Sequence, residues 1–351
     1  MTGKTTKALV AAFVVVLCLA GTTRAVELQS DHEALRRSAL ERLLGNHKVI
    51  NIVDDFLLFW DQANDKPLRT QRRIWRRTIG SKHRNYFERA VYRGAEPERR
   101  LAMLNEFLIR VPERVEAIRE LNRTITDSLL VGIITFKDFR FREYQHQRDV
   151  YIGLSFFRFD GAVRPVQNDR GIPDTLCLGA EVLATYTPEQ VRMTITHEFF
   201  HLYHFGFLFQ QSGDSSEDFR APHIPLLVEG IAVAGAEQAY DGQPRAMYLH
   251  FNEDELAAQQ KELSSNAGRY LYLIRSSAPP DEYERWFTQS YDERFPSRGG
   301  YLLGYEVAKR MMITYTLEQI VRMSSAELRA HAEEELAAMS GYRVMLVAAG
   351  R

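Results

Sequence analysis

Two histidines four residues apart, His197 and His201, enclose a glutamate in the segment His-Glu-Phe-Phe-His. Residues four apart on an α-helix project from the same face, one turn above the other. Two imidazoles placed in this way can both bind one zinc ion, at about 2.0–2.1 Å. Glu198 lies roughly 100° round the helix from His197, where a general base could take a proton from a metal-bound water molecule. The spacing therefore predicts a hydrolytic zinc site with His197 and His201 as ligands and Glu198 as the base.

The residues around this motif are typical of a buried helix. Thr187-Pro188-Glu189-Gln190 combines a capping threonine, a proline at the first helical position and a glutamine three residues after the cap. Apolar residues then recur at three- and four-residue steps from Val191 to Phe205. The alternative is a pair of hydrogen-bonded core histidines, but burying two imidazoles on so apolar a helix is costly without partners. We therefore favour a metal site.

A tetrahedral zinc site needs a third protein ligand and leaves the fourth position to water. Glu229 is the best candidate, because it lies in an apolar helix over residues 224–236, where an unpaired carboxylate is costly. Gly230 beside it would allow another helix to approach closely. His204 stands two turns from His197 and would overshoot the metal. Three further acids are explained without the metal: a solvated loop accounts for Glu217 and Asp218, and Glu237 is predicted to be a surface residue or to support a ligand.

The motifs resemble gluzincin-type peptidases, in which a Glu-Gly-x-Ala helix supplies the third ligand. They are most similar to a family of predicted zinc-dependent proteases that carry His-Glu-x-x-His, Glu-Gly-x-Ala and Gly-Tyr-x-x-Gly-Tyr in this order. Here the last element stands at residues 300–305, and the resemblance covers Leu129 to Leu336. The metzincin pattern is excluded, because it requires glycine at 204 and histidine at 207, where this chain has His204 and Phe207.

The chain departs from thermolysin-like enzymes in two respects. Twenty-seven residues separate His201 from Glu229, more than in thermolysin-type sites. Val233 stands four positions after Glu229, where an acidic residue usually supports a ligand. The resemblance still implies one zinc ion and hydrolysis of peptide bonds, with Glu198 passing the proton to the leaving amine. It also implies a donor for the oxyanion, for which Tyr301 is the first choice, Tyr305 the second and His223 the third.

We predict an α+β fold that is mostly helical. A helical N-terminal region (26–125) precedes a zincin-like metallopeptidase domain (126–345), in which a small mixed β-sheet packs on the His-Glu-x-x-His helix. Strands are predicted at Leu129–Phe136, Val150–Phe157 and Asp174–Leu183, and a loop at Asp160–Pro173. By the resemblance, the strand at 174–183 lies at the edge of the sheet beside the cleft, where an extended peptide could add to it.

The N-terminus has the layout of a secretory signal peptide, residues 1–25. Lys4 and Lys7 precede an apolar run from Ala8 to Gly21, and small residues at 23 and 25 suit a cleavage site. A periplasmic or secreted bacterial protein is predicted, and an uncleaved segment that anchors the chain in a membrane is the alternative. After cleavage only Cys177 remains, so no intramolecular disulfide can form.

The formal net charge is −1 and 45% of the residues are hydrophobic, as in ordinary globular proteins. Lys66–Arg100 is locally basic, with twelve Lys and Arg against three Glu, and the arginines from Arg69 to Arg77 follow helical spacing. This stripe is either a solvated face or a peripheral contact with an anionic membrane. No nucleic-acid-binding fold accompanies it.

Two functions from different classes follow. The first is an exported zinc metallopeptidase acting on a peptide or protein substrate. The second is a non-catalytic exported binding or assembly factor on the same scaffold. The presence of Glu198 favours the enzyme, because a binding protein has no need of a base beside the metal. Cleavage specificity and oligomeric state stay open.

Overall fold

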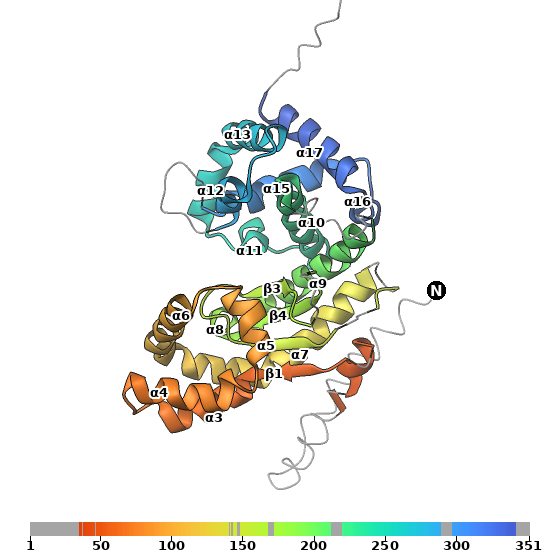
Figure 1. Cartoon of the computed structure of the whole chain (residues 1–351). Helices are drawn as coiled ribbons and strands as arrows, with labels where there is room; N and C mark the ends of the chain where they lie inside the picture. Colours follow the sequence, from red (N-terminus) through yellow and green to blue (C-terminus); the bar gives the residue numbers. More distant parts are fainter. Residues whose placement is uncertain are drawn as a thin grey trace, which may run out of the picture.

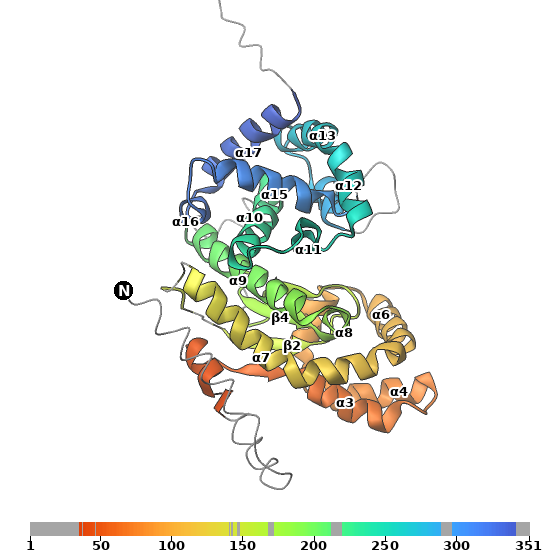
Figure 2. The same ribbon diagram turned by 180° about the vertical axis from the view of Figure 1, so that it is seen from behind.

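The computed structural model describes residues 35–36, 38–45, 47–139, 141, 143–145, 148–167, 172–211, 220–288 and 297–341. The described chain is mostly helical and contains one four-stranded mixed sheet, which agrees with the predicted α+β class. Figure 1 shows an N-terminal part with the sheet and a wholly helical C-terminal part, with α9 (Pro188–Gln211) between them. Figure 2 shows the same two parts from behind.

The sheet has the strand order β1-β2-β4-β3, with β1 (Val49–Asn51), β2 (Val150–Gly153), β4 (Thr175–Gly179) and β3 (Gly161–Arg164). β1, β2 and β4 run parallel, and β3 pairs antiparallel with β4. β1 comes from the predicted N-terminal helical region, so that region contributes a strand to the same sheet as β2. No strand was predicted there, because three residues are too few to show an alternating pattern.

The two faces of the sheet are covered by different helices. α9 packs against β3 and β4, close enough that a Cβ on Gly161 would lie 2.6 Å from the Glu198 side chain. The opposite face carries Gly153, where a Cβ would lie 2.5 Å from the ring of Tyr86. The Tyr86 ring stacks on Tyr151 of β2, with centroids 5.4 Å apart. The sheet therefore lies between α9 on one face and Tyr86 of α5 on the other.

The N-terminal helices pack around an aromatic core. They are α3 (Ile52–Ala63), α4 (Leu68–Trp75), the π-helical η2 (Arg76–Gly80), α5 (Arg84–Tyr86), the π-helical η3 (Phe87–Tyr92), α6 (Pro97–Arg110), the 3-10 helix η4 (Val111–Arg114) and α7 (Val115–Phe139). Trp75 lies at the centre of this core, edge-on to Phe59 at 5.3 Å and to Phe87 at 5.5 Å. η4 contains Pro112 and separates α6 from α7.

The C-terminal part contains only helices among the residues described. They are α10 (His223–Ala239), α11 (Arg245–Leu249), α12 (Glu253–Lys261), α13 (Leu263–Arg275), α14 (Pro280–Tyr283), the 3-10 helix η6 (Glu284–Phe287), α15 (Gly299–Met311), α16 (Leu317–Val321) and α17 (Ser325–Met339). α10 is the central helix and packs against α9, α15 and α17. A short α8 (Ala180–Leu183) follows β4 in the N-terminal part.

Two strand predictions are wrong. Residues 129–136 belong to α7, because Leu129, Ile133 and Phe136 recur at helical spacing and are fully buried. Their β-branched neighbours favour a strand only weakly, and packing of α7 along α9 outweighs that preference. The segment 174–183 is not an edge strand, since β4 pairs with a strand on each side and gives way to α8 at Ala180.

The edge position belongs to β3, within the segment 160–173 that was predicted as a loop. The strand predicted at 150–157 ends at Gly153, and Phe156 and Phe157 adopt positive φ angles of 57° and 61°. Their left-handed backbone turns the chain back towards β3. Phenylalanine rarely adopts this conformation, so the sequence did not predict the turn. The predicted signal peptide lies outside the described residues. Within the described part of the chain, no helix has both the length and the apolar character needed to span a bilayer.

Candidate metal centre

α9 begins with the predicted capping box. Thr187 Oγ1 accepts a hydrogen bond from the Gln190 backbone N–H at 3.3 Å, and the Thr187 N–H donates to Gln190 Oε1 at 2.9 Å. These reciprocal bonds satisfy backbone groups that a helix leaves unpaired at its start. The cap fixes the first turn of α9, and the helix then carries His197 and His201 on consecutive turns, with Glu198 next to His197.

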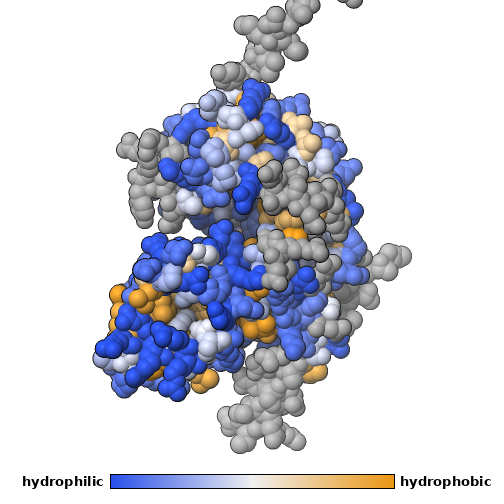
Figure 3. Space-filling model, in the orientation of Figure 1, coloured by the Kyte–Doolittle hydropathy of each residue, from blue (hydrophilic) through white to orange (hydrophobic). Residues whose placement is uncertain are grey.

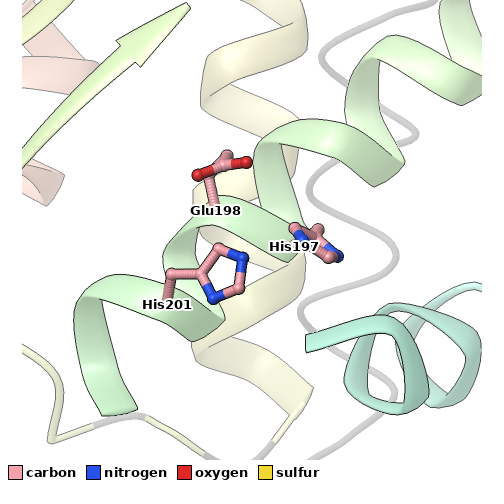
Figure 4. Close-up of side chains that lie close together, drawn as sticks. All are labelled: His197, Glu198 and His201. Carbon is pink, nitrogen blue, oxygen red and sulfur yellow. The ribbon is translucent and has the colours of Figure 1, made fainter. Parts of the chain in front are cut away.

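The two histidines share one face of α9. Their ring centroids lie 4.5 Å apart with the ring planes at 88°. His197, Glu198 and His201 form a group that could hold a metal ion, because each offers a ligand atom and these atoms lie within 4.8 Å of one another. Figure 4 shows the two rings reaching into the same space, with the Glu198 carboxylate beside them.

Glu229 of α10 reaches the same point from the opposite side. Its Oε2 atom lies 3.3 Å from His197 Nε2 and 3.2 Å from His201 Nε2. Two ligands of a tetrahedral zinc ion, each bound at about 2.0–2.1 Å, are separated by about 3.3 Å. Glu229 Oε2 therefore already stands at the spacing from each imidazole that a shared zinc ion needs.

Glycines bring the helices of the site together. A Cβ on Gly230 would lie 2.1 Å from the backbone of Gly304, and a Cβ on Gly304 would lie 2.1 Å from the Leu226 carbonyl oxygen. α10 and α15 therefore cross in backbone contact, as was predicted for Gly230 from its position beside Glu229. This crossing places Glu229 and Tyr301 on neighbouring helices.

Charges at the centre are strongly coupled because Glu198 and His201 are buried and His197 and Glu229 are half-buried. Burial would raise the pKa of Glu229, but the two histidines outweigh it and hold this pKa well below the usual range. Burial would lower the pKa of His201, but the Glu229 carboxylate outweighs it and raises that pKa. Burial, assisted by His201, lowers the pKa of His197. Glu229 is thus an anion held between the two imidazoles.

Glu198 has a different environment from Glu229. Burial raises the pKa of Glu198 to about 8, and Glu229 and Asp160 add to this while His201 opposes it. Its Oε2 atom is buried and has no hydrogen-bond partner among the described residues. A buried carboxylate with an unused lone pair and a pKa near neutrality suits a group that accepts and releases a proton.

Of the three predicted donors to an oxyanion, Tyr301 is the one that lies near the charged groups of the site. Burial raises the pKa of Tyr301 above its ordinary value, and Glu229, Asp160 and Glu198 all lie near enough to raise it further. Tyr305 instead donates to Glu237 Oε1 at 2.8 Å, and Glu237 also pairs with Lys309. His223 Nε2 lies 3.0 Å from Ser325 Oγ, at the junction with α17. Tyr305 and His223 are engaged elsewhere.

A second group of polar residues surrounds the site and was not predicted. The half-buried Asp160 accepts hydrogen bonds from Tyr186 Oη at 2.8 Å and from the Gly161 N–H at 2.8 Å. His250 stacks on Tyr186 at 5.1 Å, and the Arg298 guanidinium lies 4.7 Å above the Tyr301 ring. The only signal in the sequence was the pair Asp160-Gly161 at the start of the predicted loop, which carries no spacing relation to the histidines.

The remaining candidates are accounted for separately. His204 is 1% exposed and does not belong to the group that could hold a metal. Glu217 and Asp218 lie outside the described residues. The basic stripe forms α4 and the start of η2, with four exposed arginines, Arg69, Arg73, Arg76 and Arg77, and Arg72 half-buried.

No known protein-family model matches the chain, and no match was found among curated proteins or among solved structures.

Proposed function

We propose that this chain is an exported zinc metallopeptidase of the gluzincin type, built on a zincin-like domain. One observation carries the proposal: two histidine Nε2 atoms lie 3.2–3.3 Å from the Glu229 carboxylate, with the buried Glu198 carboxylate beside them. Two histidines and one glutamate form the ligand set of a catalytic zinc site that keeps an open position. The non-catalytic binding factor is the second candidate, but it leaves the buried Glu198 carboxylate beside the two histidines without a role.

His197, His201 and Glu229 would hold one zinc ion, which would polarise a scissile carbonyl and acidify water at the site. Glu198 is placed to accept a proton from water and to release it to the leaving amine, because its buried carboxylate keeps an oxygen atom without a hydrogen-bond partner among the described residues. The Tyr301 hydroxyl donates a hydrogen bond to the oxygen on which negative charge develops. One proton of the attacking water passes through Glu198 to the leaving amine, and the remaining hydroxide adds to the carbonyl carbon.

The edge strand supports a peptide as substrate. β3 has no strand beyond it in the described sheet, and Gly161 at its start lies against Glu198. An extended peptide could pair with β3 through main-chain hydrogen bonds, which are independent of side-chain identity. Figure 3 shows the outline of the molecule indented between its two parts, on the side where α6 and β3 lie in Figure 1. We propose that the substrate enters there.

The proposal is tested by metal analysis and by one conservative substitution. Wild-type protein should hold about one zinc ion. Glu198→Gln should keep the metal and lower peptide hydrolysis by about 10²-fold or more, because the amide cannot accept the proton. Glu189→Gln is the matched control, since Glu189 is exposed on the same helix and, among the described residues, pairs with Arg192 alone. Wild-type protein that binds no zinc, or a Glu198→Gln variant that keeps full activity, would contradict the proposal.

We also propose export to the periplasm or the medium, with membrane anchoring by uncleaved residues 1–25 as the alternative. Mass spectrometry of the protein made in a bacterial host distinguishes them. A mature chain that begins at Val26 supports cleavage, and an intact N-terminus in the membrane fraction supports the anchor.

A further inference from the structure

A second charged cavity lies in the N-terminal part, on elements that carry no residue of the metal centre. It has a volume of about 180 Å³ and is lined by side chains of α4, η2, α5, η3 and α6. Three arginines line it: Arg72, Arg76 and Arg84. Figure 3 shows the surface over α4 as strongly hydrophilic, at the lower end of the molecule.

The positive charge of this cavity is not neutralised within the described structure. Its one acidic residue, Glu88, forms an ion pair with Arg100. Arg72 donates to Asn105 Oδ1 at 2.9 Å, which leaves its charge uncompensated. Arg76 and Arg84 are exposed and form no ion pair with a described residue. Three guanidinium groups around one small cavity repel one another unless an anion lies between them.

The wall behind the arginines is rigid and aromatic. Trp75 and Phe87 line the cavity and are each 2% exposed, and their rings meet edge to face at 5.5 Å. Tyr92 completes this wall, with the Arg100 guanidinium 5.5 Å from its ring centroid. Trp75 is also in contact with Phe59 and Phe107 of the core. The cavity is therefore a fixed feature of the fold and not a gap between mobile side chains.

The backbone on both sides of the cavity is unusual. η2 and η3 are π-helical, and residues of both line the cavity. π-helical turns are rare in proteins, and those that are present frequently lie at functional sites. Here η2 begins at Arg76, and its Gly80 also lines the cavity. The irregular turns determine where the arginine side chains meet.

We propose that this cavity is a binding site for a phosphate monoester group. A guanidinium presents a planar fork of donors that matches phosphate oxygens, and three of them suit the two charges and several oxygens of a phosphate monoester. The net positive lining excludes a metal cation. The volume of about 180 Å³ excludes a nucleotide-sized ligand but admits a phosphate with a small substituent. The group could come from a soluble phosphate ester or from the headgroup of phosphatidic acid.

Calorimetric titration of the full chain with inorganic phosphate, at constant ionic strength, tests the site directly. The charge-neutralising double variant Arg76→Gln/Arg84→Gln should lower the affinity at least tenfold, because charge-assisted hydrogen bonds to two groups are lost. The matched control is Arg69→Gln/Arg73→Gln. Both of those arginines are exposed on α4 and do not line the cavity, so this variant changes the net charge equally. Its affinity should change less than about twofold.

Arg84→Lys supplies a second test should the double variant fail to fold. It keeps the charge but removes the fork, so phosphate should bind several-fold more weakly. Sedimentation with phosphatidylcholine vesicles containing phosphatidic acid, against vesicles containing phosphatidylserine, distinguishes the two sources. Binding of free phosphate alone indicates a soluble ester, and selective binding to phosphatidic acid vesicles indicates the lipid. Absence of binding in both assays, or equal losses in the two double variants, overturns the proposal.

Discussion

The metal centre and the arginine-lined cavity are both sites of concentrated charge, but they are assembled in opposite ways. The metal centre joins α9 to α10 and α15, whose site residues are spread from His197 to Tyr301. The cavity takes all of its lining from the short stretch between Arg72 and Leu104. Charges in the metal centre are buried and shift one another, whereas the arginines at the rim of the cavity face solvent.

This difference shows what burial contributes to a charged site. Little solvent separates the two histidines and two carboxylates of the metal centre. Removal of one of these groups therefore shifts the pKa values of the others. Exposed arginines interact through water and salt and can be exchanged one at a time with small effects on stability. The metal centre should therefore respond to distant packing changes, and the cavity should respond only to changes in its own lining.

The largest difference between the responses of the two sites is expected from Gly304→Ala. The added methyl group would overlap the Leu226 carbonyl oxygen, so α10 and α15 must move apart, at a cost of about 3 kcal/mol. Because Glu229 lies on α10, we expect zinc affinity to fall together with stability, while phosphate binding is unchanged. Urea denaturation, zinc titration and phosphate calorimetry measure the three quantities.

Gly206→Ala is the control for this experiment. Gly206 lies on α9 itself, and a Cβ there meets no atom within 4 Å. Alanine should stabilise the helix by about 0.5–1 kcal/mol and leave zinc affinity unchanged. Equal zinc affinities for Gly304→Ala and Gly206→Ala would show that the helix crossing does not position Glu229.

Tyr301→Phe should separate chemistry from metal binding within the first site. Loss of the hydroxyl should lower kcat about 100-fold, or roughly 2.7 kcal/mol, with KM and zinc content nearly unchanged. Tyr305→Phe is the matched variant one turn further along α15, where the hydroxyl bonds to Glu237. Steady-state kinetics on one peptide substrate compare the two. A larger loss of kcat for Tyr305→Phe would reverse the assignment.

His204→Phe should show how burial on α9 makes stability depend on pH. Burial lowers the pKa of His204 to about 3, so this side chain is neutral in the folded protein but takes up a proton in the unfolded chain. Its contribution to stability is complete above the unfolded pKa of about 6.5 and is lost as pH falls towards about 3. Between about pH 7 and about pH 5, metal-free wild type should therefore lose about 2 kcal/mol more than the variant.

Urea denaturation of both proteins in the presence of a chelator measures this difference. Phenylalanine fills the same buried space without a titrating group, so the comparison isolates the imidazole. Parallel pH dependences would mean that His204 is charged or solvated in the folded state. Arginines of the cavity stay charged throughout this pH range, so they should not contribute to this difference.

Several features could be predicted from local patterns alone. The capping box at Thr187, the helical spacing of the histidines and the apolar helix around Glu229 are each encoded within a few turns of chain, and each is present. The prediction of a strand at 129–136 was wrong for a related reason. A short apolar segment with β-branched residues suits a strand or a buried helix equally, and packing of α7 on α9 decided the outcome.

The residues around Asp160 could not be predicted, because their relation to the site is entirely non-local. Asp160 meets Tyr186 and lies near His250, 90 positions further along the chain. No periodic pattern links such distant residues. The cavity could be predicted only in part. Its arginines follow helical spacing in the sequence, but the aromatic side chains that form its wall are brought beside them by the fold.

The sequence by itself determined that a histidine pair and a base would share one helix, because a helix is specified by local spacing and by its cap. It also determined that Glu229 would need a cation, since the residues around it are apolar. Only the tertiary structure decided that Glu229 Oε2 lies 3.2–3.3 Å from both imidazoles, and that β3 and not β4 forms the edge above Glu198. These outcomes depend on helix crossings and strand order, which arise from contacts between segments far apart in the chain.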